Sequence, residues 1–256
     1  AHLCLLKEYT GYRNLTIDVL TSAPKPGFNV EKFAENVTIH KVAVHKKNLH
    51  FWRKTEVIEW LLKAWPHYRR MVRKNNYDLV HAFFGFPTGW LCYRTANKLP
   101  YIISLRGSDV PGYNIRLGLD YKLMAGLFRR IWSSAAAVVA NSKGLRQLAQ
   151  KFMPDLDISI IPNGIDTEKF LPSEKQGLTK PIHALTVCRL ISRKRLDLLI
   201  SAVARARELG LNIQLNIAGE GNLMEPLKGL ADELNVADSV IFLARVPAER
   251  MPQLYR

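Results

Sequence analysis

Short apolar runs alternate with longer segments of helical spacing along most of the chain. Short apolar runs bounded by turn residues are typical of buried strands, and apolar positions three and four apart are typical of helices. The predicted strands are 15–21, 37–44, 78–84, 101–105, 137–140, 158–161, 183–188, 213–218 and 240–243. The predicted helices are 55–73, 88–97, 117–132, 144–152, 196–209, 223–234 and 251–256. Strands alternating with helices indicate parallel α/β units, so the predicted fold class is α/β.

Two residues make local expectations more specific. Ser142 precedes the predicted helix 144–152, and its hydroxyl is expected to cap the first turn. Pro66 lies inside the predicted helix 55–73 and should kink or interrupt it, because proline has no N–H and clashes with the preceding turn.

A polar segment at 171–181, rich in proline, glycine and charge, separates two stretches of α/β pattern. Such segments are typical of linkers, so we expect one domain at 1–172 and a second at 173–256. The second holds three predicted strands, fewer than a doubly wound sheet needs, and the chain begins without methionine. We therefore expect an excerpt of a longer protein whose second domain is incomplete.

Composition excludes several classes of protein. Apolar residues make up 48% of the chain, yet no apolar run approaches the roughly 20 residues of a transmembrane helix. Cys4, Cys92 and Cys188 lie far apart, and no cysteine or histidine pair has metal-site spacing. A disulfide framework and a metal site are therefore not expected, and the cysteine usage fits a reducing cytosol.

The net charge of +15 is concentrated in the first part of the chain, where residues 1–172 carry 25 basic and 13 acidic side chains. Residues 41–74 alone hold ten basic side chains against Glu56 and Glu59. Such a field attracts polyanions, which include nucleic acid, an anionic membrane and phosphorylated substrates.

The predicted helix 55–73 carries an apolar stripe beside many of these cations. An ordinary helix covering a sheet explains the stripe, whereas an anionic membrane is the favoured explanation of the excess charge. No RNA- or DNA-binding signature accompanies the stretch, so nucleic acid is the less favoured partner. The apolar positions are Ile58, Leu61, Leu62, Trp65 and Tyr68.

Two loops of the second domain follow predicted strands. Arg189 and Lys194 precede the helix 196–209, whose N-terminus offers N–H groups to an anion, although a solvated basic loop is the alternative. The glycines of Gly219-Glu220-Gly221 permit close backbone approach to a ligand, although a tight strand-to-helix turn is the alternative. A third glycine is missing, which disfavours a nicotinamide cofactor.

In the first domain, the segment 104–113 follows a strand and holds Arg106, Ser108, Asp109 and two glycines. It could bind a polar substrate, or Asp109 could form an Asx-type turn with its own backbone. His81 lies within a predicted strand, where a hydrogen-bonded structural role is the favoured explanation.

Together these segments resemble the GT-B glycosyltransferases of family four, which are retaining and use nucleotide sugars. Residues 161–166 with Phe170 and Pro172 resemble the interdomain signature PNGVD…F.P. Residues 189–202 resemble GRL…KG.D.LI.A, residues 217–221 resemble I.G.G, and residues 240–246 resemble V.F.G.V. Residues 78–82 and 106–109 resemble D.VHAH and HG.D. The likeness spans most of the chain in the family's order.

The chain departs from these patterns at several positions. Phe83 and Arg106 stand where the family often has histidine, Arg195 where glycine follows Lys194, and Asn222 where proline is common. The family's Glu-x7-Glu motif and N-terminal glycine-rich loop are absent from these residues, so the fragment alone is expected to be inactive.

The resemblance implies two Rossmann-like domains of the GT-B type, the second incomplete. It implies transfer of a sugar, of the hexosyl type, from a nucleoside-diphosphate sugar to a sugar, lipid-linked or glycan acceptor, with retention. The implied setting is cell-surface glycan or glycolipid synthesis in the cytoplasm, at the inner face of the membrane, with the segment 41–74 toward an anionic surface. No metal and no cofactor are expected.

The resemblance also assigns roles to residues. Arg106 and Asp109 are catalytic, Arg189 and Lys194 bind the donor diphosphate, Gly219, Glu220 and Gly221 bind the nucleotide sugar, and Asn163, Gly164 and Asp166 form a hinge. Two alternatives stay open: a relative that binds nucleotide sugars without transfer, such as an epimerase, and a basic nucleic-acid-binding module.

Overall fold

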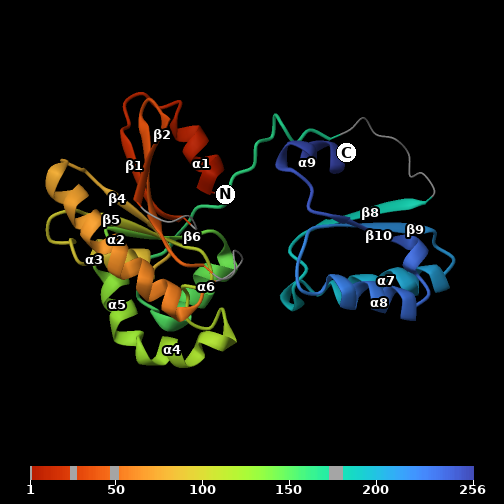
Figure 1. Cartoon of the computed structure of the whole chain (residues 1–256). Coiled ribbons are helices and arrows are strands. Elements are labelled where there is room, and N and C mark those ends of the chain that lie inside the picture. Colours follow the sequence, from red (N-terminus) through yellow and green to blue (C-terminus); the bar gives the residue numbers. More distant parts are fainter. Residues whose placement is uncertain (1, 24–27, 47–51, 173–180) are drawn as a thin grey trace. The chain divides into compact units, whose positions relative to one another are not determined.

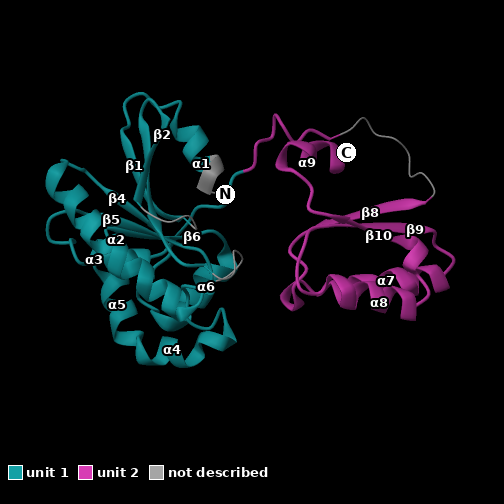
Figure 2. Ribbon diagram, viewed as in Figure 1, with its two compact units in different colours: residues 1–164 teal, residues 165–256 magenta. Residues whose placement is uncertain are grey.

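The structure, a computed structural model, describes residues 2–23, 28–46, 52–172 and 181–256. It divides into two compact units, Ala1–Gly164 and Ile165–Arg256 (Figure 2). The division falls inside the Pro-Asn-Gly-Ile-Asp motif, whereas the sequence placed the domain boundary after residue 172. Residues 173–180 of the expected linker lie outside the described residues.

The described part of unit 1 forms two sheets. In one, β1 (Ile17–Ala23), β3 (Val37–Ala43) and β2 (Phe28–Ala34) lie side by side, with β1 parallel and β2 antiparallel to β3. The other holds four parallel strands in the order β4 (Val80–Phe83), β5 (Tyr101–Leu105), β6 (Ala137–Ala140), β7 (Ser159–Ile160). The expectation of parallel strands is therefore wrong at β2. That strand is mostly exposed, so no buried periodicity marks it in the sequence.

The helices of unit 1 include two departures from prediction. The expected helix 117–132 is divided at Met124, whose ψ of 7° ends one helix before the next begins. Of the expected kink or interruption at Pro66, the interruption is wrong, because one helix runs through that residue, and a kink stays a prediction. The cap at Ser142 is confirmed, since its hydroxyl accepts a hydrogen bond from Leu145 N at 3.2 Å. The helices are α1 (His2–Tyr9), α2 (Lys54–Lys74), α3 (Thr88–Tyr93), α4 (Gly118–Leu123), α5 (Ala125–Ser133) and α6 (Lys143–Phe152).

The helix α2 packs partly through the predicted stripe, since Tyr68 is buried and Leu61 and Trp65 pack against the same core. Trp60, Ala64 and Tyr68 are buried at four-residue intervals, and Tyr68 hydrogen-bonds Thr95. Ile58 and Leu62 are exposed, so the predicted apolar stripe is wrong at these two positions. They lie two residues from Trp60 and Ala64, which places them about 200° around the helix.

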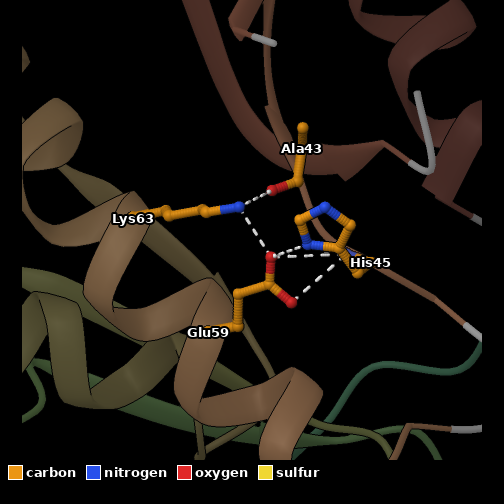
Figure 3. A network of polar contacts seen from close by, with 4 residues as sticks. All are labelled: Ala43, His45, Glu59 and Lys63. Carbon is orange, nitrogen blue, oxygen red and sulfur yellow. Dashed lines mark hydrogen bonds and ion pairs between the residues drawn. The ribbon is translucent and has the colours of Figure 1, made fainter. Parts of the chain in front are cut away.

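A polar network ties α2 to the residues that follow β3 (Figure 3). The Glu59 carboxylate accepts a hydrogen bond from Lys63 Nζ at 2.6 Å, and contacts His45 Nδ1 at 2.7 Å and His45 N at 3.2 Å. Lys63 Nζ also donates to the carbonyl oxygen of Ala43 at 3.2 Å. The Lys63 hydrogen bond, and then those of His45, lower the pKa of Glu59 to about 2.

Glu59→Gln is expected to lower the free energy of unfolding by only about 1 kcal/mol near neutral pH, because solvent screens the exposed partners. Since folding lowers the pKa of Glu59, its stabilising effect is complete above the ordinary carboxyl pKa and is lost as pH falls toward about 2. Urea unfolding of both proteins at about pH 7 and about pH 3.5 measures this, and the difference should shrink at the lower pH. A difference that stays constant would show that the charge of Glu59 plays no part.

The described residues of unit 2 form a three-stranded parallel sheet in the order β10 (Val240–Ala244), β9 (Ile213–Ala218), β8 (Ile182–Val187). The helices α7 (Leu196–Glu208) and α8 (Met224–Glu233) lie on one face of it, and α9 (Met251–Leu254) lies near the end of the chain (Figure 1). Leu196, Ile200 and Val203 of α7 face the sheet because their spacing follows one side of a helix. The three predicted strands of this unit are confirmed within a residue or two.

Among the residues that the structure describes, no helix is both long and apolar enough to cross a membrane.

Candidate functional site

In unit 1, the predicted catalytic residue Asp109 is 2% exposed, and backbone amides surround its carboxylate. Oδ1 accepts hydrogen bonds from the N–H groups of Arg106 and Gly107, both at 2.9 Å, and Oδ2 accepts one from Gly85 N at 2.7 Å. Burial raises the pKa of Asp109, and these amide hydrogen bonds oppose that rise. The carboxylate therefore joins the loop after β4 to the loop after β5.

The loop after β4 is a tightly built turn that sequence reasoning did not single out. Phe84 has a φ of 83°, in the left-handed region that non-glycine residues rarely adopt. Its N–H donates to Ser104 O at 3.0 Å, and Gly85 packs so closely on Trp132 that a Cβ would lie 2.4 Å from the indole nitrogen. The glycine within a Phe-rich segment was the available signal in the sequence.

Arg106 lies beside three other polar or aromatic residues of unit 1. Its Nη1 donates to Asn163 Oδ1 at 3.0 Å, and its guanidinium lies 5.6 Å from the Phe83 ring centre. His81 Nε2 lies 2.7 Å from Ser104 Oγ. Partial desolvation, and then the nearby Arg106 charge, lower the pKa of His81. The structure thus brings His81, Arg106 and Asn163 together at the carboxyl ends of parallel strands, where ligands bind in open α/β sheets.

The predicted hinge residues fall on both sides of the division between units. Asn163 belongs to unit 1 through its bond to Arg106, and no atom lies within 4 Å of a Cβ built on Gly164. Asp166 belongs to unit 2, where its carboxylate accepts hydrogen bonds from Glu168 N and Lys169 N at 3.1 and 2.9 Å. A hinge motion at Gly164 stays a prediction.

In unit 2, the two predicted ligand loops pack directly against each other. Leu190 N donates to Glu220 O at 3.0 Å, and Leu223 N donates to Leu190 O at 3.2 Å. A Cβ on Gly219 would lie 1.9 Å from Cys188 O, and one on Gly221 would lie 2.2 Å from Leu190 O. The backbone to which these glycines lie close is therefore that of the neighbouring loop, and their contact with a nucleotide sugar stays a prediction.

The basic loop between β8 and α7 has the geometry of a helix start. Lys194 lies in a single 3-10 turn, is exposed, and makes no hydrogen bond or ion pair through its side chain with the described residues. Arg195 pairs with Asp197 instead, its Nη2 lying 2.9 Å from Oδ2. Arg189 lies on the same loop, partly buried beside Leu190.

Two positions where the family pattern has glycine adopt left-handed backbone in this chain. Arg195 and Ala244 both have a φ of 51°. Ala244 O accepts a hydrogen bond from Gly219 N at 2.6 Å, so the end of β10 is tied to the glycine loop. The loops after all three strands of unit 2 are thereby held at one edge of the sheet.

Within the described ranges, no three His, Cys, Asp or Glu side chains lie where they could hold a metal ion together.

Two family models match neighbouring parts of the chain and together cover nearly all of it. The family model described as Glycosyltransferase Family 4 matches residues 2–169, and the one described as Glycosyl transferases group 1 matches residues 169–256.

Two curated relatives illustrate the similarity. A GDP-mannose-dependent alpha-(1-6)-phosphatidylinositol monomannoside mannosyltransferase of Mycolicibacterium smegmatis is 33% identical over 133 residues, which cover 48% of this chain and 35% of that protein. A D-inositol 3-phosphate glycosyltransferase of Nocardia farcinica is 32% identical over 209 residues, which cover 70% of this chain and 44% of that protein. The chain thus spans less than half the length of either relative.

The fold agrees with solved glycosyltransferase structures. Sucrose-phosphate synthase from Thermosynechococcus elongatus superposes with a TM-score of 0.75 at 17% identity, covering 99% of this chain and 66% of that one. This likeness shows the fold, and it confirms the predicted GT-B architecture of α/β units with parallel sheets. Because the family model covers well over half of its residues, the chain belongs to glycosyltransferase family 4.

Proposed function

We propose that the protein containing this chain transfers a hexosyl group from a nucleoside-diphosphate sugar to an acceptor hydroxyl, with retention of anomeric configuration. One observation in unit 2 carries the proposal. Backbone hydrogen bonds and close packing hold the Arg189–Lys194 loop against the Gly219–Gly221 loop at one edge of a parallel sheet. The group 1 match over the same residues supports a donor-binding role for that edge.

The donor half of the proposal rests on charge. As the glycosidic bond to a nucleoside diphosphate breaks, negative charge grows on the departing diphosphate and must be stabilised. Lys194 is exposed two residues before α7 begins, and Arg189, partly buried on the same loop, carries a planar guanidinium of the kind that can bond two phosphate oxygens. The named GDP-mannose dependence of the mycobacterial relative favours a donor of this class.

The acceptor half rests on unit 1. Arg106 is held by Asn163 and by the loop that Asp109 fixes, so its guanidinium has a defined position. Because its pKa is lowered, His81 is a neutral imidazole near neutral pH and can hydrogen-bond an acceptor hydroxyl. We assign Arg106 to contact with substrate, and Asp109 to positioning Arg106.

The relatives also suggest the kind of acceptor. The two names describe transfer to phosphatidylinositol monomannoside and to inositol 3-phosphate, which both bear an anionic phosphate. Because the first domain is strongly basic, we propose that the acceptor is anionic. We further propose that it is lipid-linked and reached from the cytoplasmic face of a membrane.

Replacing Arg189 and Lys194 together by glutamine is expected to weaken the binding of GDP or UDP at least tenfold, because charge-assisted hydrogen bonds to phosphate are lost. Isothermal titration of the protein with GDP, UDP and ADP measures this. The matched control is Arg205→Gln, which removes an exposed cation of α7 that pairs with Glu208. Binding of none of the three nucleotides, or equal binding by the double variant, would sink the proposal.

A further inference from the structure

A segment of unit 1 outside the proposed donor and acceptor residues exposes an unusual amount of aliphatic surface. Ile115, Leu119 and Leu123 are 95%, 69% and 77% exposed. They lie on the 3-10 turn 115–117 and the helix α4 that continues it. Leu119 and Leu123 lie four residues apart on α4 and therefore share one face of that helix, and Ile115 lies on the turn that leads into it. The three exposed side chains thus form an apolar row along one short segment. We call Ile115, Leu119 and Leu123 the α4 ridge.

Other side chains of the same segment and the residue after it pack against the core of unit 1. Tyr121 is buried, and its hydroxyl donates to Ser108 O at 2.8 Å. Leu117 and Met124 pack against the main core of unit 1. The α4 ridge therefore adds nothing to that core. Scattered exposed leucines are ordinary, but a contiguous apolar row on an anchored helix indicates a partner.

The charges around the ridge indicate what kind of partner it is. Arg116 and Lys122 are exposed on the same segment, and its one acidic residue, Asp120, is paired with Lys54 Nζ at 2.7 Å. An apolar row edged by cations matches the interface of an anionic bilayer, which accepts aliphatic side chains and attracts basic ones. A second copy of this chain is disfavoured as the partner, because it would bring the same exposed cations, Arg116 and Lys122, together.

The ridge is also connected to the proposed acceptor residues. The loop that carries Arg106 runs directly into it, and within that loop the Tyr113 ring packs on Gly107, where a Cβ would lie 2.7 Å from the ring. Together with the bond from Tyr121 to Ser108, this contact fixes the ridge relative to the Arg106 loop.

We propose that the α4 ridge docks unit 1 onto a phospholipid surface containing anionic lipids. Bound there, the Arg106 loop lies next to the membrane, where a lipid-linked acceptor is presented. The proposed membrane surface therefore lies at residues 115–123, whereas the charge pattern of the sequence placed it at 41–74. The part concerning the acceptor rests on the proposed function, whereas the docking itself does not.

The test is flotation of the protein with vesicles of phosphatidylcholine alone and with about 30% phosphatidylglycerol. We expect binding to the anionic vesicles that weakens between about 50 and 500 mM salt. Leu119→Ser/Leu123→Ser should reduce that binding at least about tenfold. The matched control is Leu209→Ser/Leu211→Ser, which removes two exposed leucines from unit 2 and should leave vesicle binding unchanged.

Three outcomes would overturn the inference: no binding to anionic vesicles, equal binding by the two double variants, or a dimer in light scattering that Leu119→Ser/Leu123→Ser dissociates. GDP and UDP titrations on the same samples separate this failure from that of the proposed function. Normal nucleotide binding without vesicle binding defeats the docking alone, and vesicle binding without nucleotide binding defeats the proposed transfer alone.

Discussion

Gly221→Ala is expected to destabilise the protein by about 3 kcal/mol or more, because overpacking against a backbone leaves no side chain to move aside. The new Cβ would lie 2.2 Å from Leu190 O and 2.6 Å from Leu190 C. The two loops can accommodate it only by separating, which breaks the Leu190–Glu220 and Leu223–Leu190 hydrogen bonds. Urea unfolding measures the stability, and GDP or UDP titration should show at least a tenfold loss of affinity.

Gly229→Ala is the matched control in the same unit. Gly229 lies within α8, and no atom lies within 4 Å of a Cβ placed there. Alanine in a helix interior should stabilise by up to about 1 kcal/mol relative to glycine. If Gly221→Ala destabilised the protein no more than Gly229→Ala, the close packing of the Arg189–Lys194 loop on the Gly219–Gly221 loop would be refuted.

Asp109→Ala should lower the free energy of unfolding by about 3 kcal/mol, because it strips the acceptors from three largely buried N–H groups. Asp109→Asn should lower the free energy of unfolding by about 2 kcal/mol, since the asparagine NH2 group, a donor, would face one of those N–H groups. In transfer assays both variants should lower activity by displacing Arg106, whose N–H the carboxylate binds. Thermal and urea unfolding provide the measurement.

The exposed Asp155 supplies the control for this pair, and Asp155→Asn should leave stability unchanged. Retention of wild-type stability by Asp109→Ala would mean that the carboxylate does not join the two loops. A variant that is stable yet inactive, with Arg106 unmoved in its crystal structure, would instead make Asp109 a catalytic residue.

Strands with a marked apolar pattern could be predicted from the sequence. The bounds of β5, β6 and β9 agree with their predicted ranges, because β5 and β6 are short, mostly apolar runs and β9 alternates apolar residues with Gln214 and Asn216. The antiparallel β2 was not predicted, because its apolar alternation is confined to Phe28 and Val30 and its side chains are largely exposed. The predicted stripe of α2 was wrong at two positions for a related reason: the buried row contains Ala64 and Glu56, whereas the more apolar Ile58 and Leu62 face outward.

The candidate site was predictable where chemistry and chain order coincide. Arg106, Asn163 and the glycine loop were singled out correctly as positions near strand ends. The contacts within unit 1 were not predictable, because His81, Arg106 and Asn163 come from three separate segments that only the sheet brings together. The positive φ of Arg195 explains a departure visible in the sequence, since the family pattern has glycine where the backbone is left-handed.

The most direct test of the central claim is a transfer assay on the protein with labelled GDP-mannose, UDP-glucose and UDP-N-acetylglucosamine, each with a phosphoinositide-containing lipid extract. We expect one donor to label the lipid fraction, with the donor's own anomeric configuration kept in the product. We expect the Arg189→Gln/Lys194→Gln variant to leave the lipid fraction unlabelled. Release of nucleoside diphosphate without labelled acceptor, or an inverted product, would contradict the central claim.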